Sequence, residues 1–161
     1  MKRIFLFLLA GIVLIACNKD KFQTKPQIKI KSQNTETVNF NGTLRIVLEF
    51  TDKEGDVSDT IVIVRERVNS RSPITPPIIM EKLPTFPNTD KGEIQIDFPY
   101  NVDQWGSART SLTAGIPAIC IPGTGTPCLK EQDTLNLKFV LQDKAGNESD
   151  TAITRVFVDR F

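Results

Sequence analysis

Apolar and polar residues alternate along most of the chain after residue 27. The stretch 27–31 reads Gln-Ile-Lys-Ile-Lys, and between residues 44 and 50 Leu, Ile, Leu and Phe occupy every second position. A period of two is typical of a half-buried β-strand. The same pattern predicts further strands at 61–68, 93–98, 135–141 and 152–158. Because no segment has a convincing helical period, the chain is expected to be all-β, as a sandwich of two sheets.

A short internal repeat supports this architecture. The segments 52–60 and 143–151 read DKEGDVSDT and DKAGNESDT, which agree at six of nine positions. In each copy the leading Asp can accept backbone N–H groups, and the Gly three residues later can adopt the positive φ that closes the turn. Both copies are therefore predicted to be hairpins or strand corners of the same build.

The two turns resemble those of bacterial immunoglobulin-like and fibronectin type III-like domains, where Asp-x-x-Gly-Asp or Asp-x-x-Gly-Asn often joins neighbouring strands. The resemblance implies an antiparallel sandwich of about seven strands over residues 28–161. It places the turns at the B–C and F–G connections, at one end of the sandwich. The segment 99–133 would then be the E–F connection at the other end.

The first residues have the pattern of an export signal. Lys2 and Arg3 precede an apolar run, 4–15, which is shorter than the roughly 20 residues that span a bilayer. The run ends in Leu-Ile-Ala-Cys at residues 14–17 and resembles the lipobox of bacterial lipoproteins. This resemblance implies cleavage after residue 16, lipidation of Cys17 and a membrane anchor. With Asn18 rather than Asp after the cysteine, the outer membrane is expected, on either its periplasmic face or the cell surface.

Composition narrows the range of functions that the chain can be expected to have. The chain of 161 residues has a formal net charge of +1 and no histidine. The lack of histidine removes the commonest general base and the commonest zinc ligand, so we do not expect an enzyme. Balanced charge gives no reason to expect a nucleic-acid partner. The polar segment 17–27 is expected to be a lipidated tether, because it contains three lysines and one proline.

The long segment 99–133 contains the candidates for a binding surface. Cys120 and Cys128 are expected to form a disulfide in an exported protein, although two separate buried thiols are the alternative. Aromatic residues and arginine dominate binding hot spots. The candidate contact residues are Tyr100, Trp105, Arg109, Ile119 and Ile121. The alternative for Trp105 and the isoleucines is that they cover one open end of the sandwich. A Pro-rich stretch, 72–87, is expected to cross between the sheets or to blunt a sheet edge.

Carboxylates in the first repeat copy raise the possibility of a calcium site. The residues concerned are Asp52, Glu54, Asp56 and Asp59. Calcium takes clustered carboxylate oxygens, but the spacing is not that of an EF-hand, and solvated turn acids are the alternative. No other cofactor is expected.

Together these features predict a non-catalytic lipoprotein that binds or scaffolds an envelope protein, as an accessory subunit of an outer-membrane assembly. A carbohydrate- or calcium-dependent ligand-binding module at the cell surface is the alternative.

Overall fold

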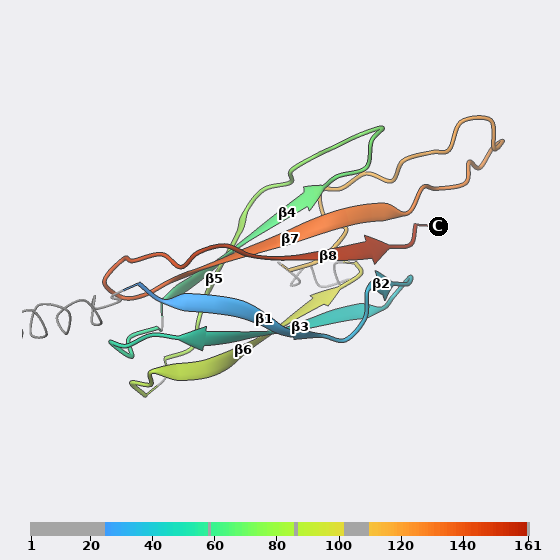
Figure 1. Cartoon of the computed structure of the whole chain (residues 1–161). Coiled ribbons are helices and arrows are strands. Elements are labelled where there is room, and N and C mark those ends of the chain that lie inside the picture. The colour runs from blue at the N-terminus through green and yellow to red at the C-terminus, as the bar shows by residue number, and fades with distance from the viewer. Residues whose placement is uncertain (1–24, 58, 86, 102–109, 161) are drawn as a thin grey trace, which may run out of the picture.

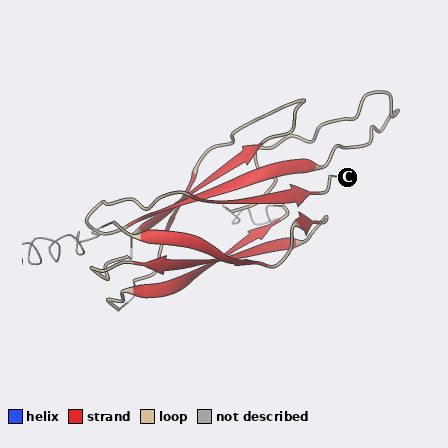
Figure 2. Cartoon of the chain, viewed as in Figure 1, coloured by secondary structure: helices blue, strands red, loops and turns tan. Residues whose placement is uncertain are grey.

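The chain folds into two packed β-sheets (Figures 1 and 2). The computed structural model describes residues 25–57, 59–85, 87–101 and 110–160, and these ranges contain no helix. The strands are β1 (Gln27–Gln33), β2 (Thr37–Val38), β3 (Thr43–Thr51), β4 (Thr60–Arg67), β5 (Ile79–Lys82), β6 (Lys91–Pro99), β7 (Asp133–Gln142) and β8 (Ala152–Val158).

One sheet has three strands in the order β1-β3-β6, and the other has five in the order β2-β8-β7-β4-β5. All pairs are antiparallel except β2 with β8, which run parallel. The expected immunoglobulin-like sandwich is confirmed, with eight strands where about seven were expected. The turn 52–59 connects β3 to β4 across the sheets, the turn 143–151 joins β7 to β8, and 100–132 joins β6 to β7, as predicted for the B–C, F–G and E–F connections.

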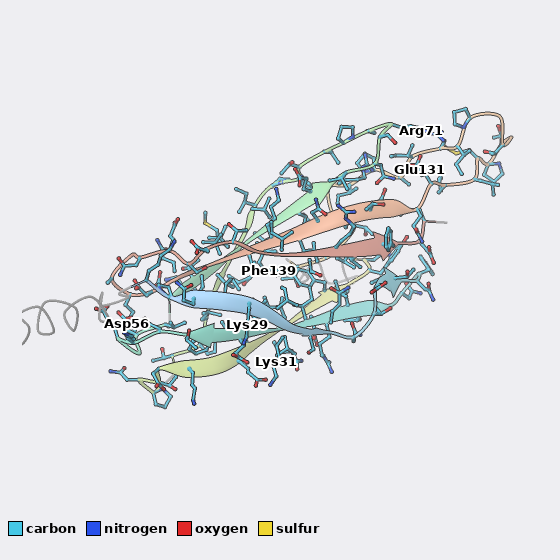
Figure 3. The ribbon with its side chains drawn as sticks, in the orientation of Figure 1. Lys29, Lys31, Asp56, Arg71, Glu131 and Phe139 are labelled. Atoms are coloured by element: carbon cyan, nitrogen blue, oxygen red, sulfur yellow. A yellow bond between two sulfur atoms is a disulfide. The ribbon has the colours of Figure 1, made fainter. Side chains whose placement is uncertain are left out.

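The core lies between the sheets and follows the predicted alternation. In β7 every second residue is buried, from Asp133 to Leu141, and β3 and β6 show the same period. Phe98 of β6 and Phe139 of β7 meet edge to face across the two layers, with ring centroids 6.1 Å apart (Figure 3). Such interlocking of side chains from two inner faces is the usual core of an aligned sandwich.

Two strands lie outside the predicted set. β2 has two residues, too few to show a period, and β5 lies within the Pro-rich stretch 72–87. β5 is the edge strand of the five-stranded sheet, and after it the chain crosses to β6 in the other sheet. The stretch therefore does both things that its prolines predicted, since it forms a sheet edge and connects the sheets.

The two ends of the sandwich differ (Figure 1). The described chain begins beside the turns 52–59 and 143–151, which we call the proximal end. Lys25 forms an ion pair there with Asp150, at 2.5 Å. The connection between β6 and β7 projects from the opposite, distal end. Residues that follow the predicted anchor therefore enter the domain at one end, and the long connection lies at the other.

Candidate functional site

The distal lobe, residues 110–132, is held by a disulfide and by backbone pairing. Cys120 and Cys128 form the predicted disulfide, with Cα atoms 5.6 Å apart. Ile121 N–H donates to the Leu129 carbonyl at 2.9 Å, and Glu131 N–H donates to the Ile119 carbonyl at 2.8 Å. The tip of the lobe is thus a covalently closed hairpin.

Buried arginines of β4 bind the base of this lobe. The Arg65 guanidinium donates to the Ser111 and Ala114 carbonyls at 2.5 and 2.9 Å. Arg67 donates to the carbonyls of Ser72 and Pro117. Arg65 is 4% exposed and Arg67 is 1% exposed. Burial lowers the pKa of the Arg65 side chain, but arginine keeps its charge in proteins. These bonds fix the lobe to the sheet through backbone oxygens.

Asp133 provides a counter-charge for Arg67 and for Arg160. Its carboxylate accepts from Arg160 at 2.6 Å and lies 3.4 Å from Arg67. Asp133 is 1% exposed. Arg160 also donates to the Ile116 carbonyl at 2.6 Å. The end of β8 is in this way joined to β4, to β7 and to the lobe.

The predicted contact residues do not form one exposed surface among the described residues. Tyr100 is 5% exposed and its ring meets Phe40 edge to face, with centroids 5.3 Å apart, so it belongs to the core rather than to a contact surface. Ile119 and Ile121 are half-buried in the lobe hairpin. Trp105 and Arg109 lie outside the described residues.

The outer face of the three-stranded sheet is covered by ion pairs. Lys29 of β1 contacts Glu49 of β3 at 2.8 Å, and Lys31 pairs with Glu93 of β6 (Figure 3). Arg45 donates two hydrogen bonds to Asp97, at 2.8 and 3.0 Å. This contact lowers the pKa of the Asp97 carboxyl. Antiparallel sheets commonly pack an apolar inner face on the core and expose a polar or charged outer face to solvent.

The outer face of the five-stranded sheet is different, because it carries apolar side chains. Met80 of β5 is 65% exposed, Ile153 of β8 is 55% exposed, and Ile78 just before β5 is 54% exposed. In the strand register, Val62 of β4 lies opposite both Met80 of β5 and Val140 of β7. Ile153 of β8 lies opposite Lys138 of β7. We call the six apolar residues of this surface the apolar sheet face: Val62, Val64, Ile78, Met80, Val140 and Ile153.

Polar residues border the apolar sheet face toward the distal end. Glu66, Asn136 and Arg155 lie on neighbouring strands there, and Arg155 donates to Asn136 at 3.2 Å. Lys138 lies within the face, opposite both Val64 and Ile153, and its ammonium pairs with Glu66 at 3.0 Å. The sequence analysis missed this face, although a signal for it was present. Residues 61–64 read Ile-Val-Ile-Val, so the side chains on both faces of this strand are apolar. Such a strand is expected to be buried on both faces.

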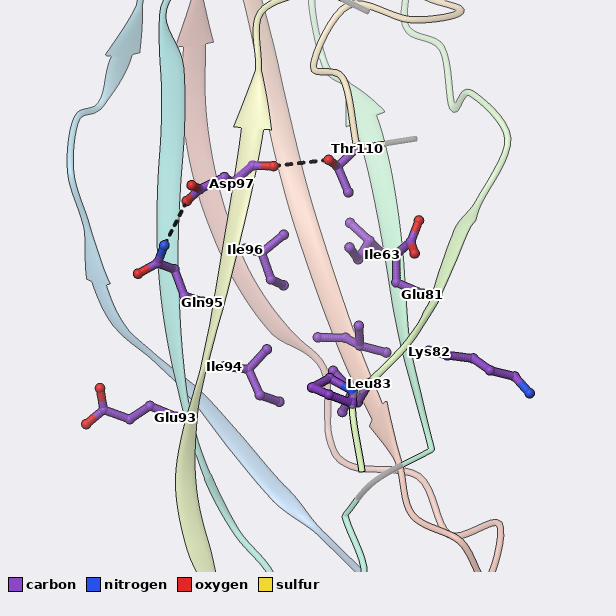
Figure 4. A pocket seen from close by; sticks show the side chains of 12 residues that line it. Ile63, Glu81, Lys82, Leu83, Glu93, Ile94, Gln95, Ile96, Asp97 and Thr110 are labelled. Atoms are coloured by element: carbon purple, nitrogen blue, oxygen red, sulfur yellow. Dashed lines mark hydrogen bonds between the residues drawn. The ribbon is translucent and has the colours of Figure 1, made fainter. Parts of the chain in front are cut away.

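A groove lies where the sandwich is open between β5 and β6 (Figure 4). Its volume is about 670 Å³. Ile63, Ile94 and Ile96 form its floor, while Glu93 and Gln95 point to the other side of β6. Asp97 also turns away, toward Gln95 and Arg45. Glu81, Lys82 and Thr110 also line the groove, so its walls are largely polar and its apolar floor belongs to the core.

The two Asp-Gly turns meet at the proximal end. Asp52 accepts the Asp56 N–H at 3.0 Å and Asp143 accepts the Asn147 N–H at 2.7 Å, as predicted for the leading residue of each repeat copy. Gly55 and Gly146 have φ values of 68° and 86°, which confirms the predicted positive φ. The resemblance placed both turns at one end of the sandwich, but their contact could not be predicted from the sequence.

Contact between the turns gathers carboxylates from both copies. Oxygens of Glu54, Asp56 and Asp143 lie within 4.8 Å of one another. Burial raises the pKa of Asp56, and hydrogen bonding to Asp52 and the negative charges around it raise that pKa further. Asp59 does not belong to this group, because it precedes β4 and is hydrogen bonded to Thr60 at 3.1 Å. Of the four calcium candidates from the sequence, Glu54 and Asp56 therefore belong to this group, Asp52 and Asp59 do not, and Asp143 of the second turn joins it.

The predicted signal segment, 1–16, and Cys17 lie outside the described residues. Within the part of the chain that the structure describes, no helix has the length and apolar character needed to cross a membrane.

No protein-family model and no curated protein matches the chain. Solved structures that match most of it include a β-glucosidase from Listeria innocua, with 12% identity, a TM-score of 0.43, 85% of this chain and 16% of that one covered. Spo0M, a sporulation control protein from Bacillus subtilis, matches with 11% identity and a TM-score of 0.41, over 85% of this chain and 50% of that one.

A Niemann-Pick type C2 protein from the Japanese carpenter ant matches with 9% identity and a TM-score of 0.42, over 83% and 93% of the two chains. The chain thus spans only a minor part of the β-glucosidase. At these identities and TM-scores, the similarities carry no argument about function.

Proposed function

We propose that the protein is a lipid-anchored, non-catalytic binding module of the bacterial outer membrane, which docks a partner protein on its apolar sheet face. The observation that carries the proposal is the contrast between the two outer faces of the sandwich. One face is covered by ion pairs, whereas the other exposes Met80, Ile153 and Ile78 by more than half of their surfaces. Contiguous exposed apolar residues on a soluble domain mark contact sites.

The orientation of the sandwich supports a partner beside the protein. The described chain begins at the proximal end, and the strands lie lengthwise between the proximal and distal ends (Figure 1). A lipid on Cys17 would hold the proximal end near the bilayer. The apolar sheet face lies along the side of the sandwich, so it would face proteins that neighbour it in the envelope rather than the membrane.

The composition of this surface favours a protein as the occupant. Apolar side chains make up most of it, and Glu66, Asn136 and Arg155 border it toward the distal end. The one lysine within it, Lys138, is paired with Glu66 of that border. An apolar centre with a polar border is the usual anatomy of a protein–protein interface. A non-catalytic role agrees with a chain that has no histidine.

Affinity purification of the full chain from gently solubilised membranes tests the proposal. The variant Met80→Glu/Ile153→Glu places two charges on the apolar sheet face, and Gln95→Glu places one on the opposite outer face as a matched control. Burying an unpaired charge is costly, so we expect the double variant to lose a stoichiometric partner that the wild type and the control retain. Equal recovery with all three proteins, or recovery of a homodimer only, would contradict the proposal.

A further inference from the structure

The proximal end contains a group of carboxylates that no side chain neutralises. Asp52 and Asp143 are 2% and 1% exposed, and Glu54 and Asp56 lie beside them. Among the described residues, none of these four carboxylates forms an ion pair with lysine or arginine. Buried charge without a counter-charge is costly, so this arrangement needs a cation or protons.

Two buried oxygens of the group lack a hydrogen-bond donor. Asp52 Oδ2 accepts the Asp56 N–H, but Asp52 Oδ1 is buried and has no partner. Asp56 Oδ1 is also buried without a partner. An acceptor that is buried and unpaired in a native structure calls for an explanation, such as a bound ion. The two residues concerned are in contact, through the Asp56 N–H that Asp52 accepts.

From these contacts we propose that the two repeat turns together form a calcium site, with Glu54 and Asp56 of the first turn and Asp143 of the second as ligands and the buried Asp52 carboxylate next to Asp56. The donors are all oxygens, which suits a hard cation. Magnesium usually retains several waters and takes one or two carboxylates, whereas calcium accepts more protein oxygens in a flexible geometry. Three carboxylate ligands on two turns, with a fourth acid adjacent, therefore favour calcium.

The position of the site gives the ion a structural role. The first turn crosses from the three-stranded sheet to the five-stranded sheet, and the second joins β7 to β8. Lys144 N–H already donates to the Asp56 carbonyl at 3.4 Å, so one backbone contact links the turns. A bound ion would hold both sheets together at the end where the predicted tether enters (Figure 3, Asp56). This site does not depend on which partner occupies the apolar sheet face.

The thermal midpoint of the purified full chain in detergent, measured with calcium, with magnesium and with chelator, tests the proposal. Calcium at about a hundred times its Kd should raise the midpoint by about 5 to 10 °C, and the same concentration of magnesium should raise it less. If calcium leaves the midpoint of the wild type unchanged, or if magnesium matches it, the proposal is overturned.

Three variants separate a metal site from a merely structural cluster. Glu54→Gln and Asp56→Asn each remove one negative charge, and Glu54 makes no side-chain hydrogen bond among the described contacts. Both should reduce calcium affinity, measured by titration calorimetry, at least tenfold, and both should raise the calcium-free midpoint because repulsion is relieved. Asp59→Asn, the matched control outside the group, should bind calcium like the wild type. Calcium affinities that are the same in Glu54→Gln, Asp56→Asn and the wild type would contradict the proposed ligands.

Discussion

At the scale of single residues, two buried arginines at the distal end share one carboxylate. Asp133 contacts both Arg67 and Arg160, and all three are nearly inaccessible to water. The arginines also donate to carbonyls of the lobe and of Ser72, so their positive charges hold backbone oxygens in place. The stability of the lobe therefore depends on the charge of Asp133.

Asp133→Asn should destabilise the protein by about 3 kcal/mol, because it leaves two buried guanidinium groups without a counter-charge. Urea unfolding followed by fluorescence measures this change. The matched control is Asp97→Asn, which removes an exposed partner of Arg45 and should cost less than about 1 kcal/mol. If both substitutions shift the unfolding midpoint by the same small amount, the buried network contributes little.

At the scale of the elements, the sequence determined most of the fold. Six long strands could be predicted because one face of each is buried and a period of two follows directly from the backbone geometry. The turn at Asp52 and its copy at Asp143 could be predicted because their bonds are local. β2 and β5 could not be predicted, because strands of two and four residues are too short to show an alternation of apolar and polar positions.

Contacts between residues far apart in the sequence could not be predicted from the sequence. Arg65 and Arg67 occupy inward positions of β4 where an apolar residue is expected, and their acceptors lie about fifty residues further along the chain. Asp143 approaches Asp56 from the opposite end of the chain. Such pairs depend on the packing of the two sheets, so the distal network and the composition of the acidic group required the structure.

At the scale of the whole molecule, the proposed function requires a membrane anchor at the proximal end. Replacing Cys17 by Ser removes the sulfur that the lipobox resemblance assigns to the lipid. We expect the full-length variant to leave the membrane fraction, since a lipid chain is what holds a lipoprotein at the bilayer. Fractionation with immunoblotting measures this, and metabolic labelling with a fatty acid should mark the wild type only. A variant that stays in the membrane fraction would show that the anchor is something else.

The arrangement of surfaces on the whole molecule also limits what the protein can contact. An anchored domain with one ion-paired outer face and one apolar outer face can bury the apolar face only against a neighbour beside it. The groove between β5 and β6 and the lobe lie on other parts of the surface, and neither exposes a comparable set of apolar side chains. A partner bound on the apolar sheet face would leave the distal lobe free for a second contact.

Photo-crosslinking in intact cells tests the central claim most directly, with a photoreactive amino acid at Met80, at Ile153 or at Gln95 of the full chain. The account predicts that the first two positions give a crosslink to the same envelope protein, and that Gln95, on the ion-paired face, gives none. A crosslink from Gln95 and none from Met80 and Ile153 would contradict the assignment of the apolar sheet face as the docking surface.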